Sequence, residues 1–127
     1  MVRARDEWDK MMSSPSAALL VEEASDGRVI GAVTVRVFDT PADPSMVPRR
    51  RAHVDTLVVD RRHRRTGVGS RLMEAAAAWG SARGAVELVL TVWAGNSGAE
   101  AFYRNLGYHD LSRALRRNLV PVAASED

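Results

Sequence analysis

The fold is decided by the stretch Leu57-Val58-Val59-Asp60-Arg61-Arg62-His63-Arg64-Arg65-Thr66-Gly67-Val68-Gly69, where an apolar strand runs into an arginine- and glycine-rich turn. The pattern of residues 52–59 predicts that strand, with His53, Asp55, Leu57 and Val59 on one face and Val54, Thr56 and Val58 on the other. After the turn, apolar residues recur at helical spacing at Val68, Leu72, Ala75, Ala76, Trp79 and Ala82. They predict a helix over 69–83 that ends at Gly84. Residues 86–93 then predict a second strand, parallel to the first and reached by a right-handed crossover.

The flanking segments predict further short elements. Residues 18–24 and 29–38, separated by the turn residues 25–27, predict an antiparallel hairpin. The proline-rich segment 39–48 predicts a surface loop, and Trp8, Met11 and Met12 predict a short amphipathic helix before Pro15. Ser97-Gly98-Ala99-Glu100 has the pattern of a capping box and predicts a helix that ends at Gly107. We expect one or two short strands over 108–119 and a flexible tail over 120–127.

Length and composition favour one soluble domain over residues 1–127. The chain has 46% hydrophobic and 27% charged residues, and no apolar run of the roughly 20 residues that span a membrane. The charged N-terminus offers no secretory signal, so a cytoplasmic location is expected. Because there is no cysteine, disulfides, thiolate metal clusters and a cysteine acyl-enzyme are excluded. The net charge is only +2, but the arginines cluster at 49–51 and 61–65, which suits a phosphate-bearing ligand, a nucleic acid or simply a solvated surface.

The turn between strand and helix has the chemistry of an anion site. Backbone N–H groups gather there at the positive end of the helix dipole, and glycines at 67 and 69 allow phosphate oxygens to approach the main chain. The alternative is that the glycines only make a tight turn and the arginines are solvated. A Walker A loop is excluded because its lysine is missing, and a dinucleotide fingerprint because Leu72 occupies the third glycine position.

The remaining pattern, R-x-x-G-x-G over Arg64–Gly69, resembles the GNAT superfamily of N-acetyltransferases. A second stretch supports this resemblance, because Asn96, Ala99, Phe102-Tyr103 and Leu106-Gly107-Tyr108 follow in the order and spacing of that family. The resemblance covers roughly residues 18–119. It implies an α/β (α+β) fold with a mixed, mostly antiparallel sheet, helices on both faces, and a central parallel strand pair that splays to hold acetyl-CoA.

The resemblance also implies which residues hold acetyl-CoA. The backbone amides around Arg65, Gly67, Gly69 and Ser70 would bind the pyrophosphate. The main chain of Leu57 and Val59 would pair with pantetheine like an added strand, and the Leu57 amide would polarise the acetyl carbonyl. The full predicted set is Leu57, Val58, Val59, Arg64, Arg65, Thr66, Gly67, Val68, Gly69, Ser70, Asn96 and Tyr103.

By the same resemblance, Tyr103 is the general acid that protonates the departing thiolate. The alternative for Tyr103 is a core aromatic beside Phe102. The base that takes the amine proton is expected on the strand before the turn, as His53 or Asp55, and histidine has the better ordinary pKa, near 6.5. The alternative is a strand histidine that merely pairs with Asp55. No metal is predicted, because His63 and His109 lack carboxylates at metal-ligand spacing.

The acceptor is expected to be a small-molecule or peptide amine that the sequence does not identify. Only about 15 residues precede the hairpin, fewer than the resemblance leads us to expect, so the acceptor site is either open or completed by a second subunit. Trp8, Met11 and Met12 could form such a homodimer interface, or their helix could cover the sheet of its own chain. Two other functions stay open: a CoA-binding module without turnover, and an arginine-rich nucleic-acid binder, for which the sequence has no recognisable motif. Neither nucleic acid nor a membrane is an expected partner.

Overall fold

The computed structural model describes residues 2–4, 16–40 and 49–121 of the chain. They fall into two compact units, one that ends at Val92 and one that begins at Trp93, and each is described by itself. The predicted helix around Trp8, the middle of the loop before Pro48 and the end of the tail lie outside the described residues. The dimer interface predicted on Trp8, Met11 and Met12 therefore stays a prediction.

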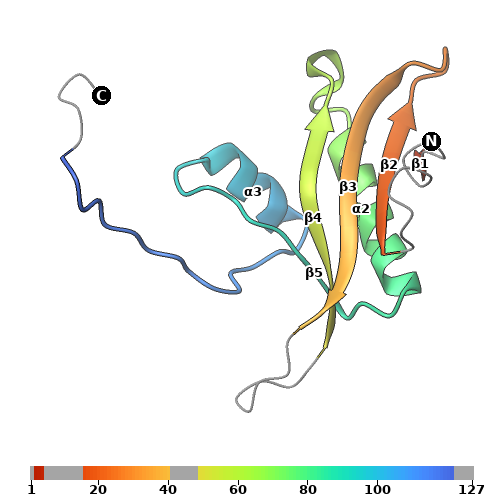
Figure 1. Ribbon diagram of the computed structural model, residues 1–127. Coiled ribbons are helices and arrows are strands. Elements are labelled where there is room, and N and C mark those ends of the chain that lie inside the picture. Colours follow the sequence, from red (N-terminus) through yellow and green to blue (C-terminus); the bar gives the residue numbers. More distant parts are fainter. Residues whose placement is uncertain (1, 5–15, 41–48, 122–127) are drawn as a thin grey trace. The chain divides into compact units, whose positions relative to one another are not determined.

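The first unit is built on a five-stranded mixed sheet (Figure 1). Its strands are β1 (Val2–Ala4), β2 (Ala17–Glu23), β3 (Val29–Asp39), β4 (Arg50–Val59) and β5 (Glu87–Val89), in that spatial order. All neighbours pair antiparallel except β4 and β5, which are parallel. The predicted hairpin and the predicted parallel pair are both confirmed.

The edges of the sheet differ from the prediction. Strand β1 pairs with β2 from Val2 opposite Glu22 to Ala4 opposite Leu20, although the sequence predicts no element over residues 2–4. A three-residue edge strand is too short to show an alternating pattern. At the other edge, β5 has only three residues of the eight predicted over 86–93.

A bulge in β4 corrects the predicted faces of this strand. Thr34 lies opposite Thr56, but the next residue, Val35, lies opposite Val54, so Asp55 is an extra residue without its own partner. The alternation therefore shifts by one beyond Asp55. Val54 is 5% exposed whereas Val58 is 55% exposed, although strict alternation places them on one face. The prediction that Leu57 and Val59 share a face with His53 is wrong for this reason.

Helix α2 (Val68–Ala82) crosses one face of the sheet and closes the core (Figure 1). Its buried positions are Val68, Leu72, Met73, Ala76 and Gly80. The buried stripe thus passes through Met73 and Gly80 rather than through the predicted Ala75, Trp79 and Ala82. Gly80 is required because a Cβ there would lie 2.7 Å from the Cβ of Ala52 on β4. Alanine-rich helices leave the stripe ambiguous, because small apolar residues occur on both sides of it.

The second unit contains helix α3 (Ser97–Asn105). The expected capping box is corrected: Asn96, not Ser97, is the N-cap, and its Oδ1 accepts from the Ala99 N–H at 3.2 Å. Both are good cap residues, so the pattern alone fits either. The strands predicted over 108–119 are wrong, because no described residue of that segment is in a strand. Leu111, Leu115 and Leu119 are exposed and recur every four residues, which is not the alternation of a half-buried strand.

Candidate functional site

Strand β4 parts from β5 directly after His53. The two strands pair only where Arg51, Ala52 and His53 face Glu87, Leu88 and Val89. In the part of the chain that the structure describes, no strand pairs with residues 54–59 on this side. A bulge bends its strand and increases the local twist, which accounts for the separation at Asp55.

The main-chain groups of Leu57 and Val59 point to this open edge. The Asp60 N–H donates to the Ile30 carbonyl of β3 at 2.8 Å. Since main-chain groups of a strand point alternately to its two neighbours, those of Val58 also face β3, and those of Leu57 and Val59 face away from it. The Arg50 carbonyl points to the β5 side, where it accepts from the Val86 N–H at 2.9 Å. Without the bulge, strict alternation from Arg50 would direct the main-chain groups of Val58 to the β5 side and those of Leu57 and Val59 to β3.

The turn after β4 is held by its own hydrogen bonds. Asp60 caps a short 3-10 helix, Arg61–His63, by accepting from the Arg62 N–H. This bond, together with His63, holds the pKa of the Asp60 carboxyl below its ordinary value. The Thr66 hydroxyl donates to the His63 carbonyl. The hydroxyl of this residue, which is predicted to bind the cofactor, is therefore already used within the turn.

The end of the turn adopts a backbone conformation that favours glycine. Gly67 is the N-cap of α2 with φ of 88°, a left-handed conformation that suits glycine, and no side chain caps the helix there. Arg65 has φ of 64° and is the one non-glycine residue with positive φ in the described part of the chain. The N–H groups of Val68, Gly69 and Ser70 lack intrahelical partners because they belong to the first turn of a helix. Such N–H groups at the positive end of the helix dipole bind anions.

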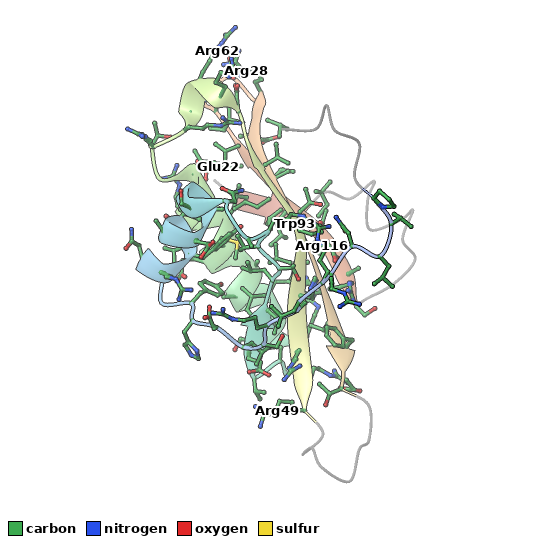
Figure 2. All side chains as sticks on the ribbon, turned by 90° about the vertical axis from the view of Figure 1, so that its left-hand side faces the viewer. Glu22, Arg28, Arg49, Arg62, Trp93 and Arg116 are labelled. Carbon is green, nitrogen blue, oxygen red and sulfur yellow. The ribbon has the colours of Figure 1, made fainter. Side chains whose placement is uncertain are left out.

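Arginines surround this turn without carboxylate partners. Arg28, at the β2–β3 turn, and Arg62 lie at one end of the sheet, and Arg49 lies at the opposite end (Figure 2). Among the described residues, none of the following arginines forms an ion pair: Arg28, Arg61, Arg62, Arg64 and Arg65. Their positive charge is therefore available to an anionic ligand.

His53 and Asp55 form one hydrogen-bonded group with Arg36. His53 Nδ1 lies 3.0 Å from Asp55 Oδ1, and Arg36 Nε donates to Asp55 Oδ2 at 3.1 Å. Both carboxylate oxygens are thus engaged, while the His53 Nε2 atom is not part of this group. Arg36 also lies over the Phe38 ring, with its Cζ 5.2 Å from the centroid. Sequence reasoning did not single out Arg36, although its register opposite His53 in an antiparallel pair is a signal that could have found it.

In the second unit, Tyr103 packs against two aromatic rings. Its ring centroid lies 5.0 Å from that of Phe102 and 5.8 Å from that of Tyr108, both in edge-to-face geometry. Burial raises the pKa of the Tyr103 phenol above its ordinary value, so the phenol is protonated at neutral pH. Asn96 uses its Oδ1 to cap α3, and its side-chain N–H groups are the donors that it can offer to a ligand.

The structure thus brings two groups of predicted residues together in the first unit. Leu57, Val59 and the turn residues form a continuous path from the open edge of β4 to the start of α2. His53 and Asp55 lie at the point where the strands part. The predicted residues Asn96 and Tyr103 belong to the second unit.

Comparison with protein families agrees with this arrangement. The profile of the Acetyltransferase (GNAT) family matches residues 1–108. The chain belongs to this family. It is therefore an acetyltransferase, and acetyl-CoA is the acyl donor that the family uses. No curated protein sequence matches it significantly.

Several solved structures share the fold of this GNAT chain at low sequence identity. A point mutant of the BH1408 protein of Bacillus halodurans has a TM-score of 0.81 at 24% identity, over 90% of this chain and 73% of its own. The aminoglycoside N-acetyltransferase AAC(6')-Iy, solved with CoA, has a TM-score of 0.77 at 16% identity, over 95% and 100%. An acetyltransferase of Trypanosoma brucei has a TM-score of 0.73 at 18% identity, over 94% and 99%. These neighbours support the mixed α/β fold.

The residues of the first unit fit acetyl-CoA. A diphosphate needs N–H donors and positive charge, which the start of α2 and the unpaired arginines supply. The peptide-like pantetheine arm needs main-chain partners, which Leu57 and Val59 offer at the open edge. None of the helices in the described part of the chain is long and apolar enough to cross a membrane.

Proposed function

We propose that this acetyltransferase transfers the acetyl group of acetyl-CoA directly to a primary amine. The observation that supports it most is the open edge of β4, which begins after His53 and leads into the turn before α2. Direct transfer is favoured because the chain has no cysteine to carry an acyl group.

The main chain of the open edge would hold and activate the donor. Leu57 and Val59 would pair with the pantetheine arm, and the Leu57 N–H would polarise the acetyl carbonyl. The N–H groups around Arg65, Gly67, Gly69 and Ser70 would bind the diphosphate, with charge from Arg64 and Arg65. Val58 would contribute only through its place in this path, and Val68 only through its main chain, since the side chain of Val68 is buried against the sheet.

The hydrogen-bonded group on β4 supports different roles for its two predicted bases. Both oxygens of Asp55 face partners, so its carboxylate would orient His53 rather than take a proton itself. With Nδ1 directed at Asp55, His53 would accept the amine proton at Nε2. His53 and Leu57 are four residues apart on a bulged strand, roughly 10 Å, so a water molecule would have to carry the proton between them.

Tyr103 would complete the reaction as the general acid. Its raised phenol pKa suits a group that must keep its proton until a thiolate departs. This role and that of Asn96 in binding pantetheine are taken from the family pattern and belong to the second unit.

The first experiment is a transfer assay with acetyl-CoA and a panel of polyamines, amino acids, aminoglycosides and peptide N-termini, supported by CoA titration. Acetylation of at least one amine is expected. CoA binding without any transfer would favour a CoA-binding module, and salt-dependent DNA binding without CoA affinity would favour a nucleic-acid binder.

Variants at three positions test the roles. Tyr103→Phe should lower kcat by a factor of roughly 10² to 10⁴ with little change in CoA affinity. His53→Ala should lower kcat by a factor of roughly 10² to 10⁴ because it removes the proposed base, whereas Asp55→Asn should lower kcat less because the imidazole remains. A larger loss of kcat in Asp55→Asn than in His53→Ala would make the aspartate the base.

A further inference from the structure

A buried carboxylate ties strand β2 to the first turn of α2. Glu22 is only 4% exposed, and glutamate is rarely this buried without a partner. Its Oε1 accepts from Arg71 Nε at 2.9 Å, and its Oε2 accepts from Arg71 Nη2 at 2.6 Å. This two-point pairing fixes the plane of the guanidinium as well as its position.

The same arginine contacts the two residues that precede the helix. Its third nitrogen, Nη1, lies 3.5 Å from the Thr66 carbonyl oxygen, and a Cβ built on Gly67 would lie 3.0 Å from it. The Arg71 N–H donates to the Gly67 carbonyl at 3.0 Å, which is the first bond of the helix. Arg71 therefore holds the end of the turn through both its side chain and its main chain.

A row of paired residues in the sheet connects this contact to the open edge of β4. Glu22 pairs with Gly31, and Gly31 pairs with Val59, so one row of residues runs from the buried carboxylate to the open edge. A Cβ on Gly31 would lie 2.8 Å from Leu72 Cδ1 and from Val68 Cγ1, so the start of α2 rests directly on that row. The position of the turn relative to Val59 is set at this row.

The pair supplies position rather than charge. The hydrogen bonds from Arg71 hold the pKa of the Glu22 carboxyl below its ordinary value, so both partners are ionised at neutral pH. Their charges cancel, and the pair adds little to the attraction of an anion. Its effect on a ligand must come from where it places the N–H groups of the turn.

We propose that Glu22 is a positioning residue for acetyl-CoA: through Arg71 it holds the Thr66–Gly67 end of the turn so that the N–H groups at the start of α2 face the diphosphate. This role rests on the proposed use of the turn as the diphosphate site. Glu22 itself does not touch the ligand.

The test measures CoA affinity by calorimetry and acetyl-CoA kinetics for Glu22→Gln, Arg71→Met and the double variant. Each single change should weaken CoA binding on the order of tenfold, or 1.4 kcal/mol, and the double variant should be no weaker than the worse single one. The KM for acetyl-CoA should rise while kcat at saturation and the KM for the amine stay within about twofold. If Glu22→Gln does not fold, Glu22→Asp and Arg71→Lys, which keep both charges but lose the two-point geometry, take its place.

The matched control is Asp39→Asn. It makes the same chemical change in another two-point pair, in which Asp39 accepts from Arg50 at 2.9 and 3.2 Å at the far end of the sheet. CoA affinity should not change in this variant. Unchanged CoA affinity in folded Glu22 variants, or an equal loss in Asp39→Asn, would overturn the positioning role. A wild-type protein that does not bind CoA would instead overturn the proposed function.

Discussion

The two arginine clusters of this acetyltransferase look alike in the sequence but differ in the structure. At one end of β4, Arg50 pairs with Asp39 at 2.9 Å, and Arg49 and Arg51 both pair with Glu87. At the other end, the arginines at 61, 62, 64 and 65 have no ion pair among the described residues. Arg51 is largely buried, whereas Arg64 is exposed at the surface of the turn.

This difference shows that a cluster of charge does not by itself indicate a binding site. The first cluster shares the carboxylates of Asp39 and Glu87 and ties β3, β4 and β5 together, so most of its charge is neutralised by partners within the protein. The second cluster surrounds a helix start that also lacks partners. Of the two clusters, as far as the described residues go, only the second combines unpaired cations with unpaired N–H groups, which together suit an anionic ligand.

The largest expected effect comes from adding a negative charge at the unpaired end. Gly69→Glu should weaken CoA binding by about 100-fold or more, because a carboxylate beside a diphosphate costs several kcal/mol. Ala82→Glu is the control, since it places the same charge on an exposed position at the other end of α2. Its CoA affinity should change by less than about twofold. Equal CoA affinity in the two variants, measured by calorimetry, would place the diphosphate elsewhere.

A second test adds a methyl group at the contact between the sheet and each end of α2, without changing charge. Gly31→Ala and Gly80→Ala place a Cβ 2.8 and 2.7 Å from existing side-chain atoms. Each should lower the free energy of unfolding by about 1–3 kcal/mol, somewhat less for Gly80, where alanine gains helix propensity. Only Gly31→Ala should also weaken CoA binding, because it lifts the start of the helix. A matching loss of CoA affinity in Gly80→Ala would show that the effect is merely one of stability.

A third test removes one charge from each cluster. Arg64→Gln should weaken CoA binding about tenfold and reduce the salt dependence of binding, with a stability change within about 0.5 kcal/mol. Arg51→Gln should do the opposite, lowering the free energy of unfolding by about 1–3 kcal/mol and leaving CoA affinity unchanged. The two readouts are CoA titration at two salt concentrations and urea unfolding. The comparison fails if both variants affect the same readout.

The smallest expected effect concerns backbone strain in the unpaired cluster. Arg65 has φ of 64°, whereas its neighbour Arg64 is extended, with φ of −68° and ψ of 148°. Arg65→Gly should therefore raise the free energy of unfolding by about 0.5–1 kcal/mol, and Arg64→Gly should not. Urea unfolding of both variants checks this difference, and a destabilised Arg65→Gly would show that the turn carries no such strain.

The sequence predicts those parts of the molecule that depend on local chemistry. Gly67 and Gly84 bracket α2 closely, because the turn before a helix and the turn after it both favour glycine, and the hairpin and the parallel pair follow from periodicity. The bulge at Asp55 is not predicted, because alternation assumes one residue on each strand per pair. The contact between Glu22 and Arg71 is not predicted either, because it joins residues 49 positions apart. The roles of the candidate site residues stay predictions that the experiments above address.

The bulge at Asp55 makes the length of β4 as important as its composition. The one extra residue between His53 and Leu57 decides whether the odd-numbered or the even-numbered residues after it point their amides to the open edge. Deleting that residue, or inserting another one, would exchange the amides of Leu57 and Val59 for those of their neighbours without altering a single side chain in the turn. Among evolving relatives of this chain, gaps in this short interval are therefore expected to occur in steps of two residues.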